Sequence, residues 1–137
     1  MRIAFGTDEE TSLTDAVVVD LAQRGHDVER VAPGEPWPEV GRAVGEAVAA
    51  GRADRGVVCC WTGTGVSIAA NKVPGVRAAL CTDATTVEGA RRWNDANVLA
   101  FGLRLTSPTV AREMIDAFLS TESDAAELPL IARLEEP

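Results

Sequence analysis

The stretch from residue 57 to residue 72, VVCCWTGTGVSIAANK, constrains the fold more than any other part of the chain. Val57 to Cys60 is a short apolar run, as in strands that are buried on both faces. The glycines at positions 63 and 65 follow, and glycine lets the backbone bend and lets a ligand approach it closely. Residues 66–72 have the pattern of a helix. We therefore expect a strand, a glycine turn and a helix N-terminus in succession.

This strand–turn–helix unit also predicts a binding site. Backbone N–H groups at a glycine turn and at the start of a helix form a concave set of donors that suits an oxyanion or a phosphate. Cys60 lies at the edge of that concavity, where a helix N-terminus favours a thiolate. The alternative is that Cys60 is a small buried hydrophobic residue. Cys59 and Cys60 should point to opposite faces of the sheet, and we expect Cys59 and Cys81 in the core.

The rest of the chain alternates between strand and helix patterns. This alternation predicts an α/β fold, a flavodoxin-like or Rossmann-like three-layer sandwich with a five-stranded parallel sheet in the order 2-1-3-4-5. We expect one domain over residues 1–137, in which residues 120–137 form a C-terminal tail with a short helix. Three helices should begin at capping side chains, namely Ser12, Asp83 and Ser107. The expected strands are 2–6, 28–31, 57–60, 76–81 and 97–101, and the main helices are 13–23, 39–50, 66–72, 84–93 and 108–119.

Topology and local chemistry select the same place for a site. In such a sheet, ligands bind beyond the carboxyl ends of the first and third strands, where the winding of the chain changes direction. Asp8 follows the first strand and Cys60 ends the third. Asp8 could instead cap the first helix, and Glu9 beside it could be a solvated loop charge or an acid–base group.

Composition excludes several classes of protein. With 46% hydrophobic and 25% charged residues the chain is an ordinary globular sequence. Its net charge of −8 disfavours binding to nucleic acid or to an anionic membrane. The strand-like start at Arg2 argues against a signal peptide, and no apolar run is long enough to span a bilayer. Three cysteines and one histidine fit neither a disulfide framework nor a metal site, so we expect a cytoplasmic protein without a metal.

Three segments carry a resemblance to a known family: residues 3–8 (IAFGTD), 60–72 (CWTGTGVSIAANK) and 94–102 (NDANVLAFG). They resemble the ribose-5-phosphate isomerase B family, which also includes the subunits of galactose-6-phosphate isomerase. The resemblance extends to about Leu119. It implies a flavodoxin-like fold, a homodimer with shared active sites that could pair into a tetramer, and isomerisation of an aldose to a ketose through an enediolate without a cofactor.

The resemblance also assigns roles to residues. Cys60 matches the catalytic base that moves a proton between C1 and C2, and the loop containing Thr62 matches the backbone donors that hold the enediolate oxygens. Asp8 matches an aspartate that contacts sugar hydroxyls. We therefore expect Cys60, Thr62 and Asp8 to be catalytic, and Glu9, Trp61, Gly63, Thr64, Gly65, Ser67, Trp93 and Asn94 to bind substrate.

Trp93 and Asn94 pose a geometric problem. They precede the fifth strand, so they should lie at the opposite edge of their own sheet from Cys60. They could reach a site at the carboxyl edge only from a partner subunit, which is a physical reason to expect a dimer.

Departures from the family pattern suggest a changed substrate. Histidines of the family are replaced by Glu9 and Trp93, a glycine by Trp61, and a tyrosine by Trp37. The family's arginine-rich tail is acidic here at residues 123–128, and only Arg133 lies nearby. Phosphate binds through donors and positive charge. We therefore hypothesise a substrate other than ribose 5-phosphate: another sugar phosphate, an unphosphorylated sugar, or an acyclic sugar that needs no ring opening. The alternatives are a non-catalytic sugar- or anion-binding protein and an epimerase that uses the same site.

Overall fold

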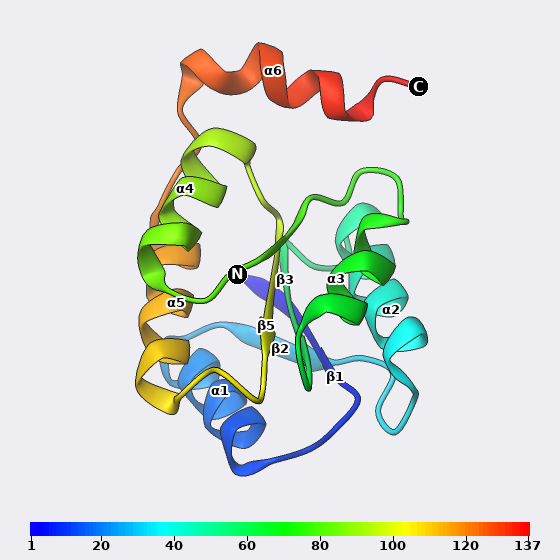
Figure 1. Cartoon of the computed structure of the whole chain (residues 1–137), viewed down its shortest axis with the longest axis vertical. Coiled ribbons are helices and arrows are strands. Elements are labelled where there is room, and N and C mark those ends of the chain that lie inside the picture. The colour runs from blue at the N-terminus through cyan, green and yellow to red at the C-terminus, as the bar shows by residue number, and fades with distance from the viewer.

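Strands and helices alternate along all 137 residues of the chain in the computed structural model (Figure 1). The expected elements are all present, with ends that differ by a few residues. The strands are β1 (Arg2–Thr7), β2 (Asp27–Arg30), β3 (Arg55–Cys60), β4 (Ala78–Leu80) and β5 (Val98–Gly102). The helices are α1 (Ser12–Gln23), α2 (Trp37–Ala49), α3 (Thr64–Asn71), α4 (Ala84–Asn94), α5 (Pro108–Ser120) and α6 (Leu128–Ala132), with short 3₁₀ turns on either side of α6.

The five strands form one parallel sheet in the order β2-β1-β3-β5-β4. The expected order was therefore wrong for the last two strands, because β5 and not β4 lies beside β3. The observed order of these two strands follows from how deeply each of them is buried. All five residues of β5 are buried, whereas β4 has only three residues and ends in the exposed Leu80. A short, half-exposed strand belongs at the edge of a sheet.

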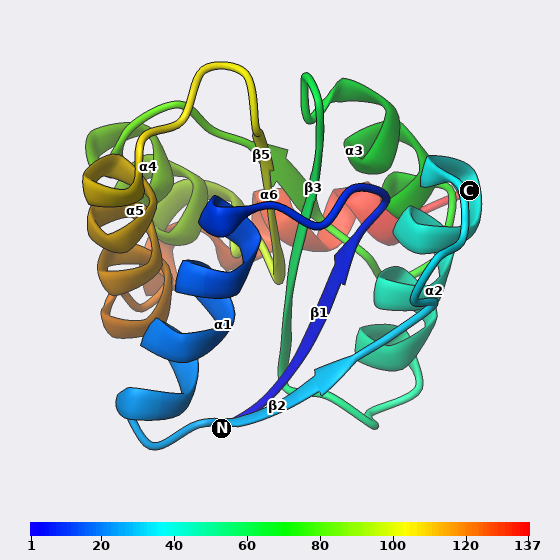
Figure 2. The same ribbon diagram turned by 90° about the horizontal axis from the view of Figure 1, so that it is seen from below.

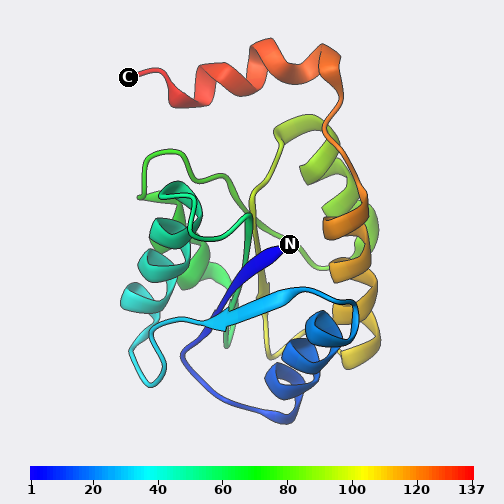
Figure 3. The same ribbon diagram turned by 180° about the vertical axis from the view of Figure 1, so that it is seen from behind.

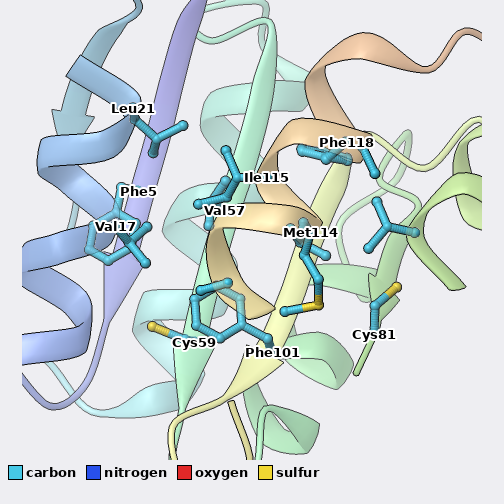
Figure 4. Close-up of a cluster of buried hydrophobic side chains, with 14 of the residues drawn as sticks. Phe5, Val17, Leu21, Val57, Cys59, Cys81, Phe101, Met114, Ile115 and Phe118 are labelled. Atoms are coloured by element: carbon cyan, nitrogen blue, oxygen red, sulfur yellow. The ribbon is translucent and has the colours of Figure 1, made fainter. Parts of the chain in front are cut away.

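Helices cover both faces of the sheet, which gives the three layers expected of this α/β class. Figure 2 shows α1, α4 and α5 on one side and α2 and α3 on the other. Side chains alternate along each strand, so successive residues enter different cores. Cys59 lies in the larger core with Phe5, Phe101 and Phe118 (Figure 4), and Cys60 lies in the smaller core under α2 and α3. The prediction that the two cysteines point to opposite faces is confirmed.

Two of the three expected helix caps are correct. The side chains of Asp83 and Ser107 accept hydrogen bonds from the third backbone N–H of α4 and α5. The cap of α1 is Thr11 and not Ser12, because the hydroxyls of Thr11 and Thr14 each accept from the other residue's backbone N–H. This reciprocal pair is a capping box, and it fixes the loop that carries Asp8.

The tail lies across one end of the molecule (Figures 1 and 3), beside the segment that leads into β4. Glu135 joins it to the sheet through an ion pair with Arg77, whose Nη1 lies 2.9 Å from the carboxylate. Ile131 is the buried anchor of α6. No helix in the chain combines the length and the apolar character that crossing a membrane would require.

Candidate active site

The ends of three parallel strands lie at one level, and this register builds the site. Thr7 is paired with Cys59, and Cys60 is paired with Gly102. The next residue after β1 is Asp8, so its carboxylate and the Cys60 thiol come from neighbouring strand ends. The switch point between β1 and β3 therefore lies where the sequence placed it.

The glycine turn is held against the end of β5. The N–H groups of Leu103 and Arg104 donate to the carbonyls of Cys60 and Trp61, both at 2.9 Å, so the pairing continues beyond the strands. Gly63 then turns the chain into α3 with φ of +78°, a conformation that strongly favours glycine. A Cβ at this position would also lie 2.6 Å from the carbonyl carbon of Phe101. Gly63 is therefore needed for the turn itself.

The turn leaves a row of backbone donors free. The N–H groups of residues 62–66, here called the amide cradle, donate to no backbone carbonyl of the chain. The first internal hydrogen bond of α3 runs from Ser67 to the Gly63 carbonyl, at 3.2 Å. The Ser67 N–H is thus occupied, and Ser67 can offer a substrate only its hydroxyl. A helix N-terminus with unpaired N–H groups is suited to negative charge.

A cavity of about 280 Å³ opens in front of this cradle. We call it the Cys60 cavity, and its lining residues are Asp8, Trp37, Cys60, Trp61, Thr62, Thr64 and Gly65. Only 5% of the Cys60 surface is exposed, yet the residue lines the cavity, so the thiol is sheltered from bulk water without being sealed off. The cavity brings together all three expected catalytic residues.

The other two thiols have a different environment. Burial raises the pKa of Cys59 to about 12 and that of Cys81 to about 11. Neither residue lines the Cys60 cavity. Both are structural residues, as expected.

Trp37 belongs to the cavity, although it was not among the expected site residues. Its indole lies against Gly65, and a Cβ on Gly65 would meet the ring atom Cε3 at 2.7 Å. Prolines on both sides of a residue are typical of an irregular loop, and the sequence pattern predicts the helix only from residue 39, but Trp37 is the first residue of α2. The signal that could have identified it is topological, since the connection from β2 to α2 must pass the same edge of the sheet as Cys60.

Several expected substrate-binding residues lie outside the cavity. Glu9 is exposed, and its backbone N–H and carbonyl both pair with the Thr7 hydroxyl, at 3.2 and 2.8 Å. Trp93 and Asn94 are at the far end of α4, where Trp93 is 58% exposed and packs its ring on Gly89. They line a separate groove of about 500 Å³ between β4 and α4, here called the Trp93 groove.

The charges near the Cys60 cavity are mainly negative. No lysine, arginine or histidine lines it. Arg30, the last residue of β2, is paired with Glu10 at 3.4 Å and with Asp15 at 3.6 Å. Arg104 is exposed, and its only backbone tie is the N–H bond to Trp61 described above. Arg104 follows the end of β5 by two residues, and it forms no ion pair with a carboxylate.

The single histidine is remote from this edge. His26 precedes β2, where the strands begin, and its Nδ1 lies 3.0 Å from the N-terminal ammonium of Met1. Burial of the imidazole is the main cause that lowers the pKa of His26 from its usual range. No imidazole is available to assist chemistry beside Cys60.

Comparison with known proteins identifies the family of this chain. The family model described as Ribose/Galactose Isomerase matches residues 3–131. Ribose-5-phosphate isomerase B of Escherichia coli is 38% identical over 128 residues, which are 88% of this chain and 85% of that protein. D-erythrulose-4-phosphate isomerase of Pectobacterium atrosepticum is 34% identical over 128 residues, 89% of this chain and 84% of that protein.

The fold has close counterparts among solved structures. Ribose-5-phosphate isomerase B of Clostridium thermocellum superposes with a TM-score of 0.93 at 36% sequence identity, covering 99% of this chain and 96% of that one. These relatives and this solved structure are sugar-phosphate isomerases, a class of aldose–ketose isomerase. The chain belongs to the ribose/galactose isomerase family.

Proposed function

We propose that this chain isomerises an acyclic sugar phosphate between its aldose and ketose forms, with Cys60 as the base. The observation that carries this proposal is the Cys60 cavity, in which a sheltered thiol, a carboxylate and an unpaired amide cradle meet. Family membership identifies the chain as a sugar-phosphate isomerase. The role of each residue and the choice of substrate are our inference.

The reaction needs one mobile proton and a place for one negative charge. The Cys60 thiolate removes the proton from C2 of the aldose, the C1–C2 double bond forms, and the carbonyl electrons move to O1. The resulting enediolate lies against the amide cradle, and each well-placed donor of this kind lowers the barrier by about 3 kcal/mol. Cys60 then returns the proton to C1, while the O2 proton passes to O1 and C2 becomes the carbonyl carbon.

Asp8 and Thr62, which both line the cavity, complete this chemistry. A carboxylate accepts hydrogen bonds from sugar hydroxyls and so orients the carbon that loses its proton. The Thr62 hydroxyl can donate to the oxygen on which charge develops. Trp37 and Trp61 offer indole faces to the C–H surface of the sugar.

The choice of an acyclic substrate follows from what the site lacks. A furanose must open before isomerisation, and opening requires a proton donor and acceptor. The only histidine of the chain lies at the edge of the sheet opposite Cys60, where it is bonded to the N-terminal ammonium, so a chain offers no imidazole to its own cavity. A tetrose 4-phosphate has no free hydroxyl with which to close a five-membered ring. The relative named D-erythrulose-4-phosphate isomerase makes this class the first to test.

A second copy of the chain is the partner that we propose. Leu80 of the edge strand β4 and Trp93 of α4 are exposed and line the Trp93 groove, and Ile68 is exposed on α3, which packs beside β4. A partner packed there would bring its own Trp93 and Asn94 toward this chain's Cys60 cavity. We propose a homodimer with shared sites, each chain being one isomerase domain. Its three unpaired cysteines suit the reducing cytoplasm.

A substrate panel tests the proposal. Initial rates would be measured with D-erythrose 4-phosphate, D-erythrulose 4-phosphate, ribose 5-phosphate, galactose 6-phosphate and the unphosphorylated sugars. We expect the highest kcat/KM with the four-carbon phosphates. Preference for ribose 5-phosphate would refute the acyclic substrate and leave the isomerase intact. Inversion at a carbon without movement of the carbonyl would identify an epimerase, and binding without turnover a non-catalytic protein.

A further inference from the structure

Two hydroxyls inside the Cys60 cavity are hydrogen-bonded to each other. The Oγ1 atoms of Thr62 and Thr64 lie 2.7 Å apart, a normal distance for an O–H···O bond. Both residues line the cavity with Cys60. The proposed mechanism uses Thr62, but it gives no role to Thr64.

The Thr64 hydroxyl has no evident structural function. Thr64 is the first residue of α3, and the cap position before it is Gly63, which has no side chain to bond the helix. The Thr64 side chain is exposed on the cavity side, and its only hydrogen bond is the one to Thr62. Folding therefore needs neither the hydroxyl nor the bond.

Either hydroxyl could be the donor in this bond, and the direction decides whether Thr62 can also donate to the substrate. A hydroxyl has one proton to donate and two lone pairs that accept. If Thr62 spent its proton on Thr64, it could not donate to the substrate. If Thr64 donates to Thr62, the Thr62 proton is free to point at the oxygen on which charge develops. An accepted hydrogen bond also polarises the hydroxyl and strengthens its own donation.

We infer that Thr64 is a positioning residue that holds the Thr62 hydroxyl in the orientation that donates to the enediolate. This inference rests on the proposed function and adds a residue to it. Thr64 itself does not touch the reacting atoms. Its effect should appear in kcat, because the charge on the oxygen develops only in the transition state.

A double-mutant cycle separates this role from a merely structural one. The variants are Thr64→Val, Thr62→Val and the double variant, with valine keeping the shape of threonine. Loss of the positioning bond should lower kcat about five- to tenfold with KM nearly unchanged, and loss of the Thr62 donor should lower kcat about a hundredfold. Once Thr62 is valine, the Thr64 change should have no further effect. Thr64→Ser, which keeps the hydroxyl, should restore most of kcat.

Several outcomes would overturn the inference. Additive losses would mean that Thr64 acts independently of Thr62. Failure of Thr64→Ser to restore kcat, or a loss of rate that parallels a fall in melting temperature, would mean that the hydroxyl is not the relevant group. A wild-type chain that turns over no sugar on the panel would refute the proposed function itself, whereas an active wild type with an additive cycle refutes only the role of Thr64.

Discussion

The benzene ring of Trp37 lies directly on Gly65, at the point where α3 begins. A Cβ at position 65 would be 2.7 Å from Cε3 and 2.9 Å from Cδ2 of the indole, closer than carbon atoms can pack. Position 65 also supplies one of the free N–H groups of the amide cradle. The absence of a side chain at this position therefore lets an aromatic wall and a row of donors share one small cavity.

This contact predicts that Gly65→Ala will damage both packing and activity. The added methyl group must displace the indole or the start of α3, which should cost about 1–3 kcal/mol of unfolding free energy and should lower kcat/KM by at least tenfold through the misplaced cradle. Urea denaturation and initial rates would measure the two effects. The control is Trp37→Ala combined with Gly65→Ala: removing the ring should recover most of the lost stability, and no recovery would show that the ring contact is not the cause.

Mixed dimers test whether the partner's Trp93 completes the site. The Cys60→Ser and Trp93→Ala variants should both be poorly active alone. A mixed dimer should contain one intact site, built from the Cys60 of one chain and the Trp93 of the other. Random exchange of subunits should then restore roughly a quarter of wild-type activity, since about half of the dimers are mixed and each has one good site. Activity that stays at the sum of the two parents would place each site within one chain.

Arg104 is the candidate for contact with the substrate phosphate. It is exposed, follows β5 at the edge where Cys60 lies, and has no carboxylate partner. Arg104→Ala should raise KM for a phosphorylated substrate about tenfold or more, because a charge-assisted hydrogen bond is lost. Arg104→Lys should have a smaller effect, since it keeps the charge without the bidentate geometry. An unchanged KM together with loss of the dimer in sedimentation would assign Arg104 to the subunit interface.

The two core thiols predict how stability depends on pH. Burial raises the pKa of Cys59 to about 12 and of Cys81 to about 11, from an ordinary value of 9.0. Their contribution to the unfolding free energy is fully present below about pH 9, the ordinary pKa of a thiol. Above it the unfolded chain loses protons that the folded chain keeps, so the unfolding free energy falls by up to about 1.4 kcal/mol per pH unit for each thiol. The chain has no tyrosine, so no phenol titrates in the same pH range as these thiols.

Urea denaturation from pH 8 to pH 10.5 would measure this decline. Cys59→Ala and Cys81→Ala should each flatten the curve, although they lower stability at neutral pH by removing packed atoms. An equally steep decline in the double variant would show that other groups cause it.

The sequence predicted well wherever a local pattern decides the structure. The run Val57–Cys60 and the glycines after it were sufficient to place β3, the turn and the start of α3. Alternation along a strand was sufficient to separate Cys59 from Cys60. The family resemblance rested on the glycine-turn segment together with residues 3–8 and 94–102, and the match to the family model over residues 3–131 confirmed it.

Prediction failed where the choice depends on distant contacts. The order of β4 and β5 follows from which of the two strands is covered on both faces. A run of apolar residues in the sequence does not show which strands will lie on either side of it. Thr11 and Ser12 are both good caps, and only the reciprocal bond with Thr14 selects Thr11. Trp37 was not placed in the cavity because its prolines indicated a loop, whereas the structure begins α2 there with Pro38 in the first turn.

The central claim is that Cys60 carries the proton between two carbons of the substrate, and hydrogen exchange tests it most directly. The substrate and its product would be incubated with enzyme in D₂O, and deuterium at C1 and C2 would be followed by NMR. The wild-type chain should introduce deuterium at both carbons. Cys60→Ser should slow this exchange by at least about a hundredfold while binding the substrate with similar affinity. Exchange at the wild-type rate in Cys60→Ser would contradict the account and would transfer the role of base to another group, such as Asp8.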